Sequence, residues 1–229
     1  MTISKPPAAL KSTSNGRAAA EATRIEEIFA RLAAANPEPE TELEFRNRFT
    51  LLVAVVLSAQ ATDVGVNKAT RGLFAVADTP EKMLALGETG LAEKIKSIGL
   101  YRTKAKNVIA LSAALLRDHA GGVPDRFEDL RALPGVGRKT ANVVLNVAFG
   151  AATIAVDTHV FRVANRIPIA RGKSPEEVEH GLMRVIPKLY LHNAHHWLIL
   201  HGRYICKAKA PLCAICPVLD LCRFNAKTA

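Results

Sequence analysis

An all-helical fold is predicted by three features of this 229-residue sequence. Apolar residues recur at the i, i+3, i+4, i+7 spacing of one helix face. Helix start signals recur as well, such as the N-cap and N1 pair Ser174-Pro175 with Glu177 completing a capping box. Sustained alternation of apolar and polar residues, which marks a half-buried strand, is missing from the sequence. We therefore expect about ten helices and no sheet.

The N-terminal part divides into an arm and a helix. Residues 1–20 are expected to be a flexible arm, because they are rich in Pro, Ser and Ala and hold no acidic residue. The first helix follows, with a buried face made of Ile25, Ile28, Phe29 and Leu32. Pro37 and Pro39 end this helix.

The remaining elements follow from local signals. The apolar run Leu51–Leu57 is short enough to be a buried strand, but the helical patterns on both sides favour a helix. Thr79-Pro80 and the pair Asp125 and Glu128 are N-terminal capping patterns that open further helices. Another helix carries Val108, Leu111 and Leu115 on one face and ends at Gly121-Gly122.

The charge of the chain indicates an anionic partner. Lys and Arg number 31 against 21 Asp and Glu, for a net charge of +10. Nucleic acid and an acidic membrane surface are the candidates, and a basic chain without such a partner is the alternative. The longest aliphatic run is far shorter than the roughly 20 residues of a membrane-spanning helix, and no secretory signal is present. We expect a cytoplasmic protein.

All four cysteines lie close to the C-terminus in a C-x6-C-x2-C-x5-C pattern: Cys206, Cys213, Cys216 and Cys222. Crowded cysteines in a cytosolic chain indicate a metal site before disulfides. Zinc modules usually contain two C-x2-C pairs, whereas this pattern has one, and its unequal loops suit an iron–sulfur cluster better. Zinc remains open at this point. Lys207 and Lys209 fall in the first loop, where a metal would hold them against an anion; two solvated lysines are the alternative.

A glycine-rich turn between two helices is the candidate anion site. Asp125–Arg131 is expected to be a short helix, Leu133–Gly137 the turn, and Arg138–Leu145 the second helix. Glycines at 135 and 137 let a phosphate approach the backbone N–H groups, and the second helix directs its positive dipole end to the same place. An ordinary turn between helices is the alternative.

Two residues near this turn are candidates for catalysis. Lys139 lies in the first turn of the second helix, where the positive dipole end favours the neutral amine that a nucleophile requires. A solvated lysine that contacts phosphate is an equal alternative. Asp157 follows the apolar stretch 154–156 and is expected to cap the next helix, and a capping carboxylate is held rigidly, as catalysis requires.

These segments together resemble the endonuclease III family of helix-hairpin-helix DNA glycosylases. The resemblance rests on Leu133–Ala141, Val156–Val160, Leu57–Asp63, Ser97–Tyr101 and the four-cysteine pattern, all in the order that the family has. It extends from about Glu21 to Arg223. Each motif alone is weak, but five in the same order are highly specific.

The resemblance implies a bifunctional base excision repair enzyme, a glycosylase and abasic-site lyase acting on oxidised pyrimidines in duplex DNA. Lys139 would be the nucleophile, Asp157 the second catalytic residue, and the four cysteines would hold a [4Fe-4S] cluster. Gln60, Leu100 and His159 would fill the gap left by the extruded base. Further DNA contacts would come from Gly135, Val136, Gly137, Arg138, Thr140, Lys207 and Lys209.

Two helical lobes are implied as well. Residues 41–151 would form a six-helix lobe with the hairpin, and residues 21–40 plus 152–229 a second lobe with the cluster, in a monomer associated with the nucleoid. A related mismatch or adenine glycosylase is the nearest alternative, although the adenine enzyme lacks the hairpin lysine. A DNA-binding module with a structural metal and an electron carrier are the others. Four histidines at 192, 195, 196 and 201 are expected to be structural or surface residues.

Overall fold

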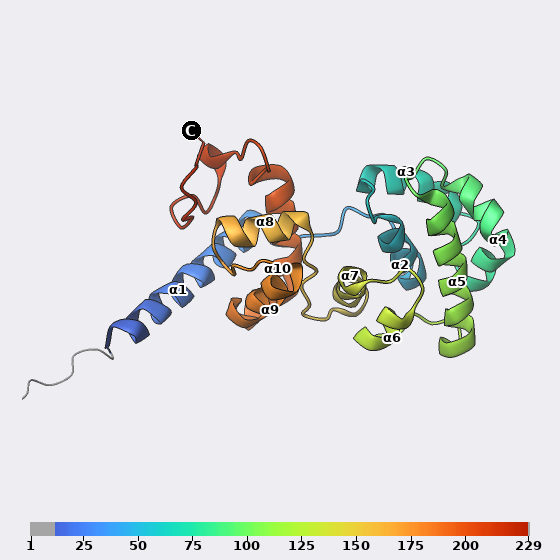
Figure 1. The fold of residues 1–229 in the computed structure, drawn as a ribbon, viewed down its shortest axis with the longest axis horizontal. Helices are drawn as coiled ribbons and strands as arrows, with labels where there is room; N and C mark the ends of the chain where they lie inside the picture. Colours follow the sequence, from blue (N-terminus) through green and yellow to red (C-terminus); the bar gives the residue numbers. More distant parts are fainter. Residues whose placement is uncertain (1–11, 229) are drawn as a thin grey trace, which may run out of the picture. The chain divides into compact units, whose positions relative to one another are not determined.

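The computed structural model describes residues 12–228, which are helical without a strand (Figure 1). Ten α-helices, one π-helical segment and one 3-10 segment make up this part of the chain, which confirms the all-α prediction. The chain forms two compact units. One is built from Pro39–Asp157, and the other from the segments that end at Glu38 and begin at Thr158.

The boundaries of these units differ from the predicted ones by a few residues. The predicted second boundary was 151/152, whereas the unit that begins at Pro39 extends to Asp157. The reason is that the segment from Ala151 to Ile154 is hydrogen-bonded to the helix that precedes it, through Asn142 and Asn146.

The predicted flexible arm is wrong for residues 12–20. Helix α1 spans Ser12–Ala35 and therefore includes them. Alanines at 18–20 and 22, the best helix formers, let the helix extend beyond its packed part. Residues 1–11 of the predicted arm lie outside the described part of the chain.

Unit 2, Pro39–Asp157, is organised around helix α2 (Arg48–Leu57). Nine of its ten residues are buried, so the apolar run forms a central helix and not a strand. Asn47 caps its N-terminus, and α3, α5 and α7 pack around it. The helices of unit 2 that follow α2 are α3 (Asp63–Phe74), α4 (Pro80–Lys94), α5 (Tyr101–His119), α6 (Phe127–Ala132) and α7 (Arg138–Phe149).

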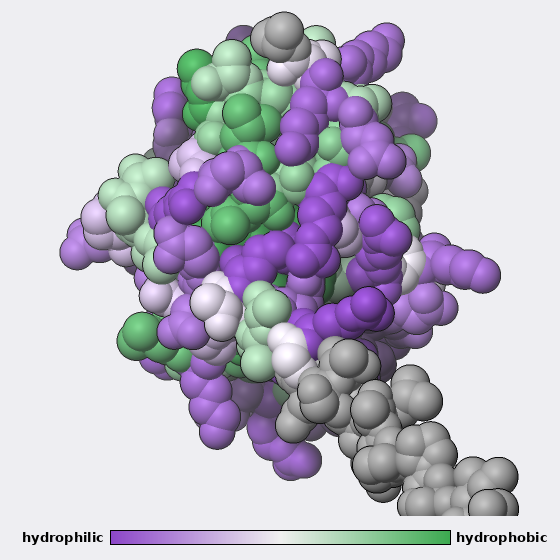
Figure 2. All heavy atoms as spheres, turned by 90° about the vertical axis from the view of Figure 1, so that its left-hand side faces the viewer, coloured by the Kyte–Doolittle hydropathy of each residue, from purple (hydrophilic) through white to green (hydrophobic). Residues whose placement is uncertain are grey.

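Unit 1 packs α1 against α10. The predicted face of α1 is buried, with Phe29 fully covered and its ring 6.4 Å from that of Trp197. Trp197 in turn donates from Nε1 to the carbonyl of Asn36 at 2.8 Å. The other elements are α8 (Thr158–Arg166), α9 (Pro175–Val185), α10 (Lys188–Leu200), the π-helix His201–Ile205 and the 3-10 segment Cys213–Ile215. Figure 2 shows hydrophobic residues between hydrophilic side chains on one face of this unit.

Two of the predicted helix caps are present and one is not. The side chains of Thr79 and Ser174 accept from the backbone N–H groups three residues later, as predicted. The capping pair at Asp125 and Glu128 is wrong, because α6 begins at Phe127 and its N-cap makes no side-chain hydrogen bond. Phe127 packs against the hydrophobic core, and this contact fixes the start of the helix.

Candidate functional site

The glycine-rich turn forms the hairpin between α6 and α7 in unit 2. Gly135 adopts φ 77°, a conformation that disfavours side chains, and an added Cβ would stand 2.9 Å from Cβ of Asn107 on α5. Val136 is buried beneath the turn, with 6% of its surface exposed, and anchors it. The turn therefore exposes its two glycines and buries the side chains of Leu133 and Val136.

The N-terminus of α7 is open to an anion. Gly137 is its N-cap and provides no side-chain acceptor, so the first N–H groups of α7 have no side-chain cap. Arg138 stacks its guanidinium over Phe127, 5.3 Å from the ring centroid. Lys139 follows with an exposed side chain, and Thr140 is half-buried. Five predicted DNA contacts and the predicted nucleophile thus lie at one helix end.

Polar side chains inside unit 2 connect α7 to the segment that carries Asp157. Asn146 donates to the carbonyls of Ala151 and Thr153, and Asn142, one turn earlier on α7, donates to Ile154 at 3.3 Å. Because later residues of the segment pair with earlier residues of α7, the two run antiparallel. The segment therefore leads Asp157, which is half-buried, toward the end of α7 that carries Lys139.

Gln60 and Leu100 have the same unusual backbone conformation. Gln60 has φ 54° and Leu100 has φ 58°, the left-handed region that non-glycine residues seldom adopt. Both side chains are exposed, Leu100 to 62%. Strained residues of this kind gather at functional sites. Two predicted wedge residues are therefore exposed on unit 2, each set by a strained backbone.

His159, the third predicted gap-filling residue, lies in the first turn of α8 in unit 1. Its Nδ1 is 3.2 Å from Nη2 of Arg162, which also donates to the carbonyls of Gly202 and Cys206. Gly202 packs closely on His159, since an added Cβ would lie 2.8 Å from Cβ of the histidine. The position of His159 thus depends on the segment that leads to the first cysteine.

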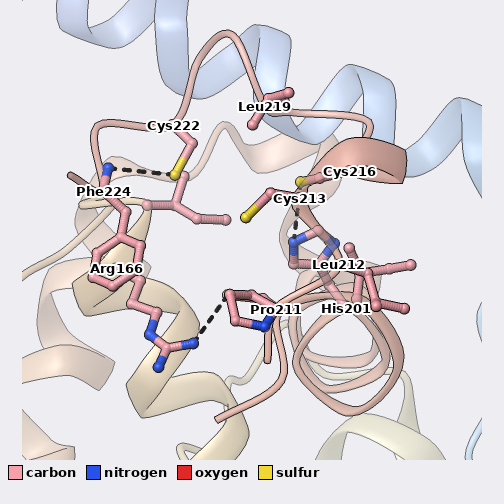
Figure 3. Close-up of a pocket in the computed structure, with 12 residues that line it drawn as sticks. Arg166, His201, Pro211, Leu212, Cys213, Cys216, Leu219, Cys222 and Phe224 are labelled. Atoms are coloured by element: carbon pink, nitrogen blue, oxygen red, sulfur yellow. Dashed lines mark hydrogen bonds between the residues drawn. The ribbon is translucent and has the colours of Figure 1, made fainter. Parts of the chain in front are cut away.

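The four cysteines line one pocket in unit 1. Figure 3 shows Cys213, Cys216 and Cys222 turned toward this common space. No disulfide joins the four thiols. The rest of the lining is mostly apolar: Ile167, Ile205, Pro211, Leu212, Leu219 and Phe224, with Arg166 and His201. None of the described His, Cys, Asp and Glu side chains form a group of three that could hold a single metal ion.

The electrostatics of this pocket bear on the charge of the thiols. Burial raises the pKa of the Cys216 thiol, which disfavours a bare thiolate. Two groups favour negative sulfur: the guanidinium of Arg166, 3.9 Å from Sγ of Cys206, and the N–H of Phe224, which donates to Cys222 at 3.5 Å. Burial also lowers the pKa of His201 to about 4, so that this ring is neutral beside Cys216. The donor set therefore fits a positively charged group that binds thiolates.

Arg162 and Arg166 are functional candidates that the sequence analysis missed. Both lie on α8, one turn apart, and both bind backbone carbonyls of the loop that follows the π-helix. No motif marked them, because an Arg pair at i and i+4 is ordinary on a helix surface. Lys207 and Lys209 lie exposed on that loop, as predicted.

The four histidines that were expected to be structural or surface residues divide between buried and exposed positions. His195, His196 and His201 are buried, whereas His192 is exposed. Lys104 on α5 is only 5% exposed, unlike its exposed neighbours Arg102 and Lys106. No helix in residues 12–228 has the length and apolar character needed to cross a membrane.

Comparisons with known proteins agree with the resemblance. Residues 53–188 match the family model of the HhH-GPD superfamily base excision DNA repair protein. The chain is 59% identical over 204 residues to endonuclease III of Rickettsia conorii, covering 89% of this chain and 97% of the relative. It is 57% identical to endonuclease III of Escherichia coli K12 over 201 residues, covering 88% and 95%.

Solved structures give the same result. A non-covalent endonuclease III–DNA complex is 48% identical, with a TM-score of 0.83, covering 88% of this chain and 95% of that chain. A trapped endonuclease III–DNA covalent intermediate is 49% identical, with the same TM-score and coverage. A thermostable thymine-DNA glycosylase, 23% identical with a TM-score of 0.76, shares the fold.

Proposed function

The chain belongs to the endonuclease III family of HhH-GPD base excision DNA repair proteins and is a DNA glycosylase and abasic-site lyase, and we propose that Lys139 and Asp157 perform its chemistry. The observation that carries this proposal is the antiparallel course of segment 151–157 along α7. It leads Asp157 toward the helix end that presents the exposed Lys139.

The reaction that we propose begins with the amine of Lys139. Its nitrogen bonds to C1′ of the damaged nucleotide as the glycosidic bond breaks, and the base leaves with the bonding electrons. Opening of the sugar ring gives a protonated imine at C1′, which makes the protons on C2′ acidic. Loss of one of these C2′ protons then expels the 3′ phosphate by β-elimination. Asp157 accepts a proton from the lysine or stabilises the positive charge on the sugar. A covalent DNA intermediate trapped in a relative supports the covalent route.

DNA contacts are proposed on both units. The backbone of Gly135, Val136 and Gly137 and the N-terminus of α7, with Arg138 and Thr140, bind phosphates of the duplex. Leu100 and Gln60 enter the stack when the damaged base is extruded, at a cost of a few kcal/mol. His159 assists at the gap, and Lys207 and Lys209 bind further phosphates. The net charge of +10 supports this polyanionic partner.

We propose that Cys206, Cys213, Cys216 and Cys222 hold a [4Fe-4S] cluster. Four thiols around one mostly apolar pocket, with Arg166 beside them, suit a multi-atom, thiolate-bound group. When bound, the cluster provides the positive charge that keeps the four thiols deprotonated and ties together the loops between them. The proposed substrates are oxidised pyrimidines and abasic sites in duplex DNA. The enzyme would act as a monomer on the DNA of the bacterial nucleoid.

The test is covalent trapping on a duplex with one thymine glycol. With borohydride, the wild-type enzyme should form an enzyme–DNA adduct and nick the strand without added divalent metal. Lys139→Gln should form no adduct while still binding the duplex. Lys94→Gln, which removes an exposed lysine at the end of α4, is the matched control and should trap like the wild type.

Efficient trapping by Lys139→Gln would refute the assignment of the nucleophile. Binding without nicking by the wild type would favour a non-catalytic DNA-binding module. A panel of thymine glycol, 5-hydroxycytosine and dihydropyrimidine duplexes then identifies the preferred lesions.

A further inference from the structure

The loop between the first two cysteines, residues 207–211, has little backbone hydrogen bonding of its own. Lys207 donates to Ile205 at its start and Leu212 donates to the same carbonyl after its end. Between them, the N–H groups of Ala208, Lys209 and Ala210 donate to no backbone carbonyl in residues 12–228. A segment of this kind must be fixed by side chains or remain mobile.

One side chain provides most of this support. Arg166, at the end of α8, donates from Nη1 to the carbonyl of Lys207 and from Nη2 to that of Ala208, both at 2.6 Å. Two bonds from one planar guanidinium fix direction as well as distance. The carbonyls of two successive residues are therefore held in one orientation, which sets the directions of the side chains beside them.

The guanidinium is itself held in place. It lies over the ring of Phe224, 5.0 Å from the centroid, and within 3.9 Å of Sγ of Cys206 (Figure 3). Phe224 follows the last cysteine, Cys222, so both ends of the cysteine-rich segment contact the same arginine. Arg166 thus connects α8, the thiol pocket and the lysine-bearing loop.

We propose that Arg166 is a positioning residue for DNA binding, which holds Lys207 and Lys209 in the conformation that meets the phosphate backbone. The inference rests on the proposed function, in which these two lysines bind DNA. Arg166 acts through the loop backbone: its guanidinium binds two carbonyls and lies against the Phe224 ring and Sγ of Cys206, whereas the lysines make the phosphate contacts. Loss of its fork geometry should therefore matter even when its charge is kept.

Arg166→Lys is the informative variant, because an ammonium keeps the charge but cannot span two carbonyls in one plane. The slope of log affinity for a lesion duplex against log salt should become shallower by about 1 to 2, the contribution of one or two phosphate contacts. Amide hydrogen exchange of residues 207–211 should become faster. That exchange is measured without DNA, so it tests the loop contact even if the proposed enzymatic function fails.

Arg31→Met is the matched control. Arg31 binds the other loop of the same pocket, at the carbonyl of Pro217 and the carboxylate of Asp220, 2.6 Å away. That loop carries no lysine. Arg31→Met should speed amide hydrogen exchange near residues 217–220 and leave the slope of log DNA affinity against log salt unchanged. If Arg31→Met made the salt slope as shallow as Arg166→Lys does, the proposal would be overturned, because any damage to the thiol pocket would then weaken the phosphate contacts.

A double-mutant cycle makes the test specific to the lysines. Lys207→Met with Lys209→Met should reduce the salt slope by about 2 if each binds a phosphate. Adding Arg166→Lys to that pair should change the slope little further, because its effect runs through the same two contacts. If the changes in salt slope from Arg166→Lys and from the two lysine variants simply added, Arg166 would affect DNA binding by a route other than Lys207 and Lys209. The visible absorbance of the bound iron–sulfur group, measured for every variant, verifies that each sample is equally loaded.

Discussion

Gly135 and Asn107 are in such close contact that the hairpin has no room for a side chain at its tip. A Cβ on Gly135 would lie 2.9 Å from Cβ of Asn107, and the glycine also holds φ 77°. The neighbouring Gly137 has open space around it and an ordinary φ of −87°. The two glycines of the turn therefore have different roles.

Gly135→Ala should lower the free energy of unfolding by roughly 2 kcal/mol, since it combines left-handed strain with overpacking. Gly137→Ala should leave stability nearly unchanged but weaken DNA binding, because its methyl group would stand where a phosphate approaches the backbone. Urea unfolding and duplex titration of both variants separate the two effects. Equal stability losses in the two variants would contradict this distinction.

Asn142→Ala should slow the chemical step, because it removes a side chain that holds the segment leading to Asp157. The carbonyl of Ile154 would lose its partner at a cost of about 1–3 kcal/mol in stability. Single-turnover nicking rates of the folded enzyme measure the catalytic part.

Asn67→Ala is the control for Asn142→Ala. The side chain of Asn67 also binds backbone in unit 2: it accepts from the N–H of Glu44 and donates to the carbonyl of Glu42, in a part of the sequence far from Asp157. It should lose stability and keep the wild-type nicking rate. A rate in Asn142→Ala as fast as in Asn67→Ala would show that the segment is positioned by other contacts.

Leu100→Gly should stabilise the fold slightly while reducing activity. Leu100 has an exposed side chain and a left-handed backbone, φ 58°, which is strained for leucine. Glycine relieves most of this strain but loses more backbone entropy on folding, so the free energy of unfolding should rise by about 0.5 kcal/mol. Nicking of a lesion duplex should fall because the wedge is gone. Ala120→Gly relieves similar strain at the other end of α5 (φ 49°) and should leave nicking unaffected. A fully active Leu100→Gly enzyme would exclude the wedge role.

Lys104→Met should stabilise the protein at neutral pH. Nζ of Lys104 is buried without a hydrogen-bond partner in the described residues, and burial lowers its pKa. A lysine whose pKa is lower in the folded than in the unfolded state destabilises the fold at pH values below both. This penalty disappears as the pH rises toward the ordinary value of 10.5.

The gain in the free energy of unfolding for Lys104→Met should therefore be about 1–3 kcal/mol at pH 7 and narrow in alkaline solution. Chemical denaturation of the wild type and the variant across this pH range measures it. The exposed Lys106→Met on the same helix should show neither effect. A gain that stays constant with pH would mean that the Lys104 ammonium is not the cause.

The sequence by itself determined the helical class, the hairpin and the crowded cysteines. These depend on local chemistry: helical spacing in Ile25–Leu32, glycines in the turn, and four thiols within a short segment. The resemblance assigned roles to Lys139 and Asp157 for the same reason, since each stands in a short contiguous motif.

Tertiary structure decided what depends on partners distant in the chain. Arg166 became a candidate only when its guanidinium was seen to bind residues 41 and 42 positions away. Lys104 has a sequence context like that of its solvated neighbours, and only helix packing buries it. The start of α6 followed Phe127 and the core, not the local cap pattern at Asp125. Long-range contacts cannot be read from short spacings, because the residues that supply them leave no local periodicity.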